Sequence, residues 1–124
     1  MAELHQAHII ISESDMQRLR AVLDLHQSVA SDDLDAELHR ALVVPHDSVP
    51  ADVVTMDRDV VYEDVETLAR RRVRLVYPQH SDPKRGWISV LAPIGSALLG
   101  LRVGQCIEWQ LPTGRKRVRI VEVE

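Results

Sequence analysis

Aromatic side chains are scarce in this 124-residue chain. It has no phenylalanine, and its aromatic residues are Tyr62, Tyr77, Trp87 and Trp109. The core must therefore be built from valine, leucine and isoleucine. A ligand pocket walled by aromatic rings is disfavoured for the same reason.

Cysteine and long apolar runs are equally rare. Cys106 is the single cysteine, so an internal disulfide is excluded. A cysteine content this low is typical of proteins in the reducing cytoplasm. No apolar run approaches the roughly 20 residues that span a bilayer. We expect a cytoplasmic protein of one or two small units with no membrane partner.

Charge is divided unevenly along the chain. Residues 1–69 carry 15 acidic and 4 basic residues, whereas residues 70–124 carry 4 acidic and 11 basic residues. Such a split indicates either that two surfaces meet different partners or that the two halves neutralise each other within one fold.

The N-terminal part has the pattern of two short amphipathic helices. Ser12 can cap a helix over residues 13–29, on which Met16, Leu19 and Leu23 share one face. Ser31 is the expected cap of a second helix, which ends before Pro45. The expected product is an antiparallel helical hairpin with an acidic tip.

Strand signals dominate after Pro45. In chain order, the expected strands cover residues 53–56, 60–62, 72–77, 87–90, 106–111 and 115–123. Valines of both parities in the last strand indicate a β-bulge, and residues 92–100 suit one short helix that begins at Pro93. We therefore predict an α+β protein in which the helical hairpin of residues 1–45 precedes an antiparallel sheet wrapped on one short helix, residues 46–124.

Four acids at the expected hairpin tip are the candidate metal-directed groups: Asp32, Asp33, Asp35 and Glu37. Carboxylates suit Mg²⁺, although a lone tip is too open to hold it tightly and could only share an ion held by a partner. Helix capping and dipole compensation explain the same acids without any function. The six histidines lack zinc-site spacing, and no nucleophile elbow or phosphate loop is present. We therefore expect no catalytic residue, metal site or cofactor.

Two basic clusters follow, at Arg70, Arg71, Arg72 and Arg74 and again at residues 115–119. They could contact nucleic-acid phosphates or an acidic protein, or pair with acids of the same fold. Few aromatic residues lie between them, so any nucleic-acid contact is expected to be weak.

A family resemblance is carried by residues 52–56, 75–78, 88–104 and 107–109, above all by the run from Ala92 through Pro93-Ile94-Gly95 to Gly104. These segments resemble the Rnk family, the regulators of nucleoside diphosphate kinase, which share the C-terminal domain of the GreA and GreB transcript-cleavage factors. The resemblance covers nearly the whole chain, including the short hairpin.

The resemblance implies an FKBP-like C-terminal domain that binds RNA polymerase near its secondary channel, with the hairpin pointing into that channel. The residues it suggests for polymerase contact are Arg70, Arg71, Arg72, Pro93, Ile94, Gly95, Ser96, Leu98, Leu99 and Gly100. The tip is shortened between Leu34 and Ala36 relative to Gre factors, and the helices are shorter than Gre arms. We therefore expect a regulator that occupies the Gre site without stimulating cleavage. The alternatives are an active cleavage cofactor and an FKBP-type prolyl isomerase.

Overall fold

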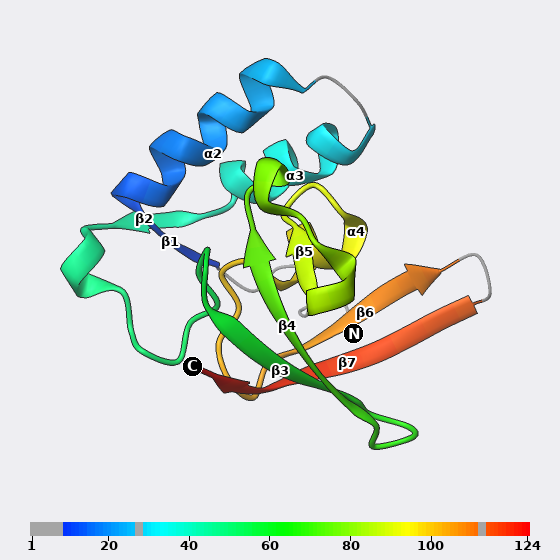
Figure 1. Ribbon diagram of the computed structural model, residues 1–124. Helices are drawn as coiled ribbons and strands as arrows, with labels where there is room; N and C mark the ends of the chain where they lie inside the picture. Colours follow the sequence, from blue (N-terminus) through cyan, green and yellow to red (C-terminus); the bar gives the residue numbers. More distant parts are fainter. Residues whose placement is uncertain (1–8, 27–28, 112–113) are drawn as a thin grey trace.

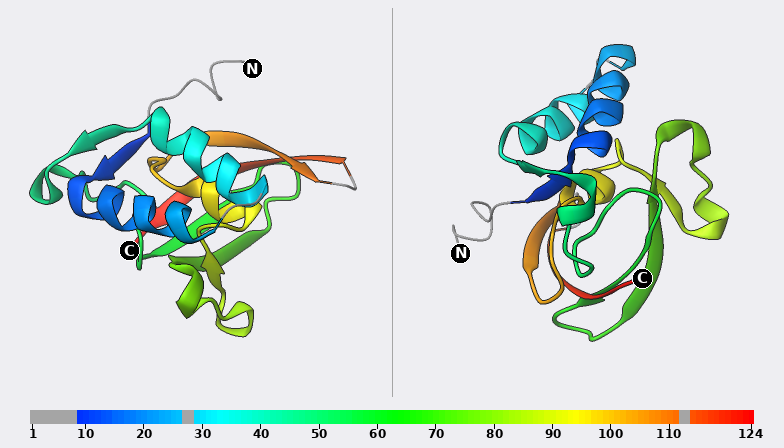
Figure 2. Two further views of the ribbon diagram at one scale, coloured as in Figure 1. Left: turned by 90° about the horizontal axis from the view of Figure 1, so that it is seen from above. Right: turned by 90° about the vertical axis from the view of Figure 1, so that its left-hand side faces the viewer.

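The computed structural model describes residues 9–26, 29–111 and 114–124. Two helices lie together at one end of the molecule, and a twisted sheet lies at the other (Figures 1 and 2). The N-terminal elements are β1 (Ile10–Ser12), α2 (Glu13–Leu25), α3 (Val29–His39) and β2 (Leu42–Val44). The remaining elements are the 3-10 turn η1 (His46–Ser48), β3 (Asp59–Asp64), β4 (Arg70–Val76), η2 (Pro78–His80), η3 (Pro83–Arg85), β5 (Trp87–Ser89), α4 (Pro93–Leu98), β6 (Cys106–Leu111) and β7 (Gly114–Val123).

Helix α2 begins where the sequence predicts. The Ser12 hydroxyl accepts a hydrogen bond from the Asp15 backbone N–H at 3.1 Å, which satisfies one of the unpaired donors of the first turn. Leu19 and Val22 are buried on the apolar face. The helix ends at Leu25, before the expected end at residue 29.

Helix α3 starts earlier than its sequence suggests. It begins at Val29, so Ser31 lies inside the helix and is buried rather than capping it. Leu34 and Leu38 point into the core, and that burial favours the helix over the turn signal of Ser31 and the two aspartates that follow. The prediction of a Ser31 cap is therefore wrong.

Strands β1 and β2 form a parallel pair that the sequence did not reveal. Ile10 pairs with Leu42 and Ser12 with Val44. The Ile10 N–H also donates to the Gly100 carbonyl at 3.2 Å, so β1 joins the helical part to the end of α4. Three-residue strands have too few positions for an alternating pattern to emerge.

The main sheet has the strand order β5-β4-β3-β7-β6. Its pairs are antiparallel except β4 with β5, which is parallel, so the prediction of an antiparallel sheet is wrong at that edge. Residues 77–86 make the crossover that a parallel pair needs, and this segment projects from the body (Figure 2). The expected bulge is confirmed, because Val61 pairs with Glu122 while Tyr62 pairs with Ile120, leaving Val121 as the extra residue.

Residues 53–56 do not form the expected strand. Val53 makes one isolated bridge with Arg102, while Val53 and Val54 are both fully buried. The apolar run is explained by the burial of consecutive side chains, and it does not require hydrogen bonding to a neighbouring strand.

One apolar core joins the two ends of the molecule. Ile9, Ile11 and Leu34 belong to the same cluster as Leu98 and Ile120. Helix α4 lies between α3 and the sheet and contacts both. None of the described helices is long and apolar enough to cross a membrane.

Candidate functional site

The four candidate acids all lie on α3, not on the turn before it. Asp32 and Asp33 are exposed in its first half. Asp35 pairs with Arg20 of α2 at 2.7 Å and lies 3.3 Å from the His39 imidazole. Glu37 pairs with Arg40 at 3.0 Å. Two of the four carboxylates are thus held by nearby arginines, Arg20 on α2 and Arg40 just after the end of α3.

A shallow hollow of about 580 Å³ separates α2 and α3 on this side. It is lined by Arg20, Leu23, Asp24, His26, Ser31, Asp32 and Asp35. Among the described residues, no group of three or more acids, histidines or cysteines is arranged to hold a metal ion. Of the carboxylates that line the hollow, Asp35 is the one with an ion pair among the described residues.

The run that carries the family resemblance is mostly buried. Pro93 occupies the first turn of α4 and is exposed, whereas Ile94, Ser96, Leu98 and Leu99 are 1–7% exposed. Ile94, Leu98 and Leu99 belong to the apolar core and pack α4 against the rest of the molecule. Of the seven polymerase-contact candidates in this run, Pro93 is the one whose side chain is open to solvent.

Two glycines in the same run are required by close backbone packing. A Cβ on Gly95 would lie 2.3 Å from the Ser89 carbonyl oxygen, and one on Gly100 would lie 2.5 Å from the Ile9 Cβ. Gly100 also has a φ of +81°, in the left-handed region that favours glycine. The packing of α4 therefore explains both glycines.

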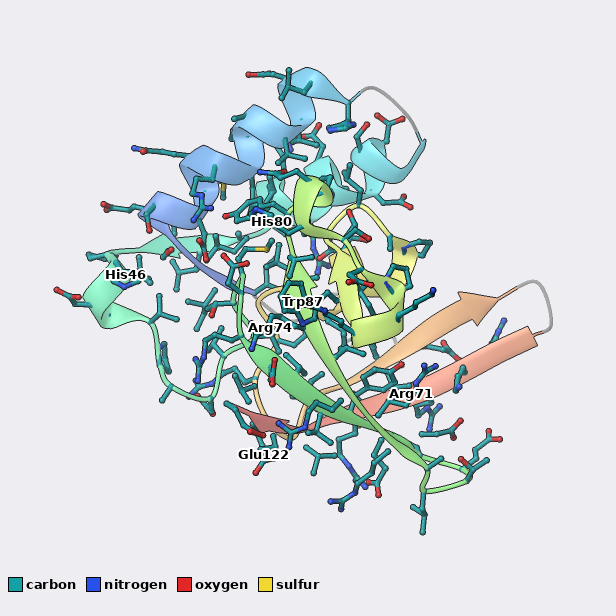
Figure 3. All side chains as sticks on the ribbon, in the orientation of Figure 1. His46, Arg71, Arg74, His80, Trp87 and Glu122 are labelled. Atoms are coloured by element: carbon teal, nitrogen blue, oxygen red, sulfur yellow. The ribbon has the colours of Figure 1, made fainter. Side chains whose placement is uncertain are left out.

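The arginines of β4 alternate between paired and unpaired. Arg70 pairs with Glu63 at 3.4 Å, and Arg72 pairs with Glu124 and lies 3.6 Å from Asp59. Arg71 forms no ion pair among the described residues and hydrogen-bonds Tyr62 instead. Arg71 is thus the member of the triplet whose charge is most available to a partner (Figure 3).

Glu63 forms ion pairs with two arginines on the outer face of the sheet. Arg119 donates to it at 2.8 Å, and Arg70 approaches from β4. The hydrogen bond from Arg119 holds the pKa of the Glu63 carboxyl below its usual value. The acids that pair with the basic strands come from residues 59–64, 108 and 122–124, whereas the acids of α3 pair locally. Neutralisation within the sheet thus accounts for most of the strand arginines.

Two guanidinium groups contact the ring of Trp87 at the β5 edge. Arg74 is 5.2 Å and Arg85 is 5.1 Å from the centre of its ring. Figure 3 shows Arg74 beside Trp87. Each arginine also pairs with an aspartate, Asp59 and Asp82 respectively. This stack fastens the projecting 77–86 segment to the sheet.

A buried tyrosine–aspartate contact was not predictable from the sequence. The Tyr77 hydroxyl donates to Asp15 at 3.3 Å, and the Arg18 guanidinium lies 4.2 Å above the Tyr77 ring. Burial raises the pKa of the Asp15 carboxyl. Tyr77 and Asp15 are 62 positions apart, so no local pattern could have brought them together.

Comparison with known proteins gives a consistent identification. Residues 49–124 match the family model described as transcription elongation factor, GreA/GreB, C-term, and residues 7–44 match that of the Rnk N-terminus. The chain is 38% identical over 120 residues to the regulator of nucleoside diphosphate kinase of Escherichia coli strain K12, covering 94% of this chain and 88% of that protein.

Transcription factors are also among its relatives. The chain is 30% identical to the elongation factor GreA of Limosilactobacillus fermentum, over 73% of this chain and 58% of that protein. A solved structure of a prokaryotic transcription elongation factor GreA/GreB from Nitrosomonas europaea is 45% identical, with a TM-score of 0.80 over 94% of this chain and 98% of that one. These relatives are named as regulators or transcription factors. The chain therefore belongs to the Rnk family of regulators of nucleoside diphosphate kinase, with a C-terminal part of the GreA/GreB type.

Proposed function

We propose that this chain binds RNA polymerase at the Gre-factor site, near the secondary channel, and regulates transcription without stimulating transcript cleavage. The observation that carries the proposal is the match of residues 49–124 to the GreA/GreB C-terminal family, joined to a short helix pair whose acids are partly neutralised.

The C-terminal part supplies the polymerase-binding half of the proposal. Among the candidate residues there, Pro93 at the start of α4 is exposed, and Arg71 on β4 is exposed without an ion pair to a described residue, whereas the exposed Arg70 and Arg72 are paired. The buried residues Ile94 to Gly100 contribute by holding α4 in place. Pro93 and Arg71 both lie within residues 49–124, so the proposed polymerase-binding surface belongs to the GreA/GreB-type part of the chain.

The helix pair supplies the argument against cleavage. Helix α2 has 13 residues and is therefore only about 20 Å long at 1.5 Å per residue. Two-metal cleavage needs a second ion about 3.5–4 Å from the first, which requires freely directed carboxylates. Asp35 is held by Arg20, and the exposed Asp32 and Asp33 are neighbours that point about 100° apart around the helix.

The test uses a backtracked elongation complex given this protein, with and without a Gre factor. We expect no cleavage from this protein alone and reduced cleavage when it competes with the Gre factor. A pull-down with core polymerase should retain the protein, and Arg71→Gln should weaken retention, whereas the exposed control Asp47→Asn should not.

The active-cofactor alternative makes a different prediction. Robust cleavage by the protein alone that disappears in Asp33→Asn or Asp35→Asn would show that the acids are catalytic. Absence of any binding to core polymerase would remove the proposal altogether.

A prolyl isomerase is the second alternative, and it follows from the expectation of an FKBP-like C-terminal part. The described aromatic side chains argue against it, since Tyr62 and Tyr77 are buried and the ring of Trp87 is contacted by two arginines. A protease-coupled assay on a proline peptide should show no acceleration.

Two lesser contacts complete the proposal. Arg71, Lys84 and Arg117 have no ion pair among the described residues, so these three side chains could make a weak contact with nucleic acid.

The family name also links the chain to nucleoside diphosphate kinase. Mixing that enzyme with this protein and measuring co-elution tests whether the link is direct.

A further inference from the structure

A second cavity lies where the N-terminal helices meet the rest of the molecule. Its volume is about 470 Å³, within the range of small-molecule sites, and it is distinct from the hollow between α2 and α3. One wall is the start of α2, another is the segment from η1 to Val49, and the third is residues 55–58. Figure 3 shows His46 on the η1 segment.

Arg18 is the residue of this cavity that best indicates what kind of ligand would bind there. Its guanidinium is stacked 4.2 Å above the ring of the buried Tyr77 and forms no ion pair with a described residue. Stacking fixes the plane of the group and leaves its edge donors for another partner. A planar fork of this kind matches the two oxygens of a carboxylate or phosphate.

The cavity is lined by two arginines, one histidine and two aspartates, so an oxyanion is recognised by the guanidinium groups themselves and not by an excess of positive charge. Arg58 lines the same cavity, and its Nε donates to the main-chain oxygen of Glu124 at 2.9 Å, which leaves the terminal Nη groups of its guanidinium for a second partner. His46 adds a third nitrogen group. Asp15 opposes them, but its carboxylate is already engaged by the Tyr77 hydroxyl and the Met56 backbone N–H. Asp57 is then the remaining acid of the lining.

Apolar surface completes the cavity. Val49 and Met56 line it beside the charged groups. A mixture of a few convergent polar groups with apolar wall is typical of sites for small organic ligands.

From this arrangement we propose that the cavity binds a small molecule bearing an oxyanion, a phosphate or a carboxylate, which Arg18 and Arg58 clamp while its apolar part lies against Val49 and Met56. This site is independent of polymerase binding, so the fate of one proposal leaves the other untouched. The bound molecule bridges α2 to residues 46–58 and so fastens the helix pair to the sheet.

The probes are inorganic phosphate and, separately, acetate, each titrated at constant ionic strength into the ¹⁵N-labelled full chain. We expect saturable shifts of backbone amides in residues 12–18 and 46–58 with at least one probe. A response to phosphate alone assigns a phosphate ligand, and a response to acetate alone assigns a carboxylate.

Four variants make the assignment specific. Arg18→Gln and Arg58→Gln should each weaken binding about tenfold or more, because each removes a charge-assisted contact. Arg18→Lys keeps the charge but loses the planar fork, so its affinity should fall between those of the parent and Arg18→Gln. Arg40→Gln, which changes an exposed arginine outside the lining of the cavity, should leave the affinity unchanged.

Arg18→Gln could weaken the fold, because Arg18 stacks on the buried Tyr77. Arg58 makes no such contact, so Arg58→Gln tests the site without that risk. Shifts that never saturate with either probe, or that persist in both Arg18→Gln and Arg58→Gln, would overturn the proposal.

Discussion

Gly100, just after the end of α4, lies close to the start of the N-terminal strand. Its φ is +81°, and a Cβ there would lie 2.5 Å from the Ile9 Cβ. We expect Gly100→Ala to lower the free energy of unfolding by about 2–4 kcal/mol, through left-handed backbone strain together with overpacking.

Urea unfolding of the parent and the variant measures this loss. Gly104→Ala is the matched control, because Gly104 has a φ of +93° but no heavy atom within 4 Å of the place that a Cβ would take. The control should lose only the strain contribution, about 1–2 kcal/mol. Equal losses in the two variants would contradict the proposed contact with Ile9.

Glu63 should make stability depend on acid pH. Its folded-state pKa is lowered chiefly by the hydrogen bond from Arg119. The stabilisation is therefore fully present above the ordinary glutamate pKa of about 4.3 and is lost as pH falls through the lower folded value. Glu63→Gln should destabilise the protein at neutral pH and flatten this acid limb.

Thermal unfolding from pH 7 down to the acid limit measures the effect. The exposed Glu66 lies in the turn after β3, and Glu66→Gln should leave the acid limb unchanged. A parent and Glu63→Gln with parallel pH profiles would show that the two arginines do not stabilise the ionised form.

At the level of elements, α2 depends on its cap. Ser12 is buried, and its hydroxyl accepts from the Asp15 N–H, so Ser12→Ala leaves that donor without its partner. We expect a loss of about 1 kcal/mol in the free energy of unfolding. Ser14→Ala in the same turn is the control and should change stability less. Urea midpoints of the two variants decide the point, and a larger loss in Ser14→Ala would contradict the capping role.

The whole molecule raises the question of whether its C-terminal part is an independent domain. Residues 46–124 contain the five-stranded sheet and α4, and we predict that this fragment folds alone. It should be less stable than the full chain, because Leu98 and Leu99 share one core with Ile9, Ile11 and Leu34. Cooperative urea unfolding at a lower midpoint is the expected result, and a broad transition without cooperativity would refute the prediction.

Elements with strong local signals were predictable from the sequence. The cap and apolar stripe of α2, the alternation in β4, Pro93 at the start of α4 and the mixed parity of β7 each reflect chemistry within a few residues. The bulge at Val121 follows from the same local pattern. Family membership could be inferred from the sequence because the residues that carry the resemblance are neighbours in the chain, from residue 88 to residue 104, and Gly95 and Gly100 in this run are required by close packing.

Longer-range features were decided by the tertiary structure. The parallel pairing of β1 with β2, the irregular course of residues 53–56 and the early start of α3 all depend on burial against distant segments. The contact between Tyr77 and Asp15 joins residues 62 positions apart, and several arginines have partners at similar separations. The sequence by itself determined which segments could be helices or strands, because capping, periodicity and turn chemistry are local. Only the folded chain decided which charges are neutralised and which remain open to a partner, because ion pairing depends on distances that no local pattern encodes.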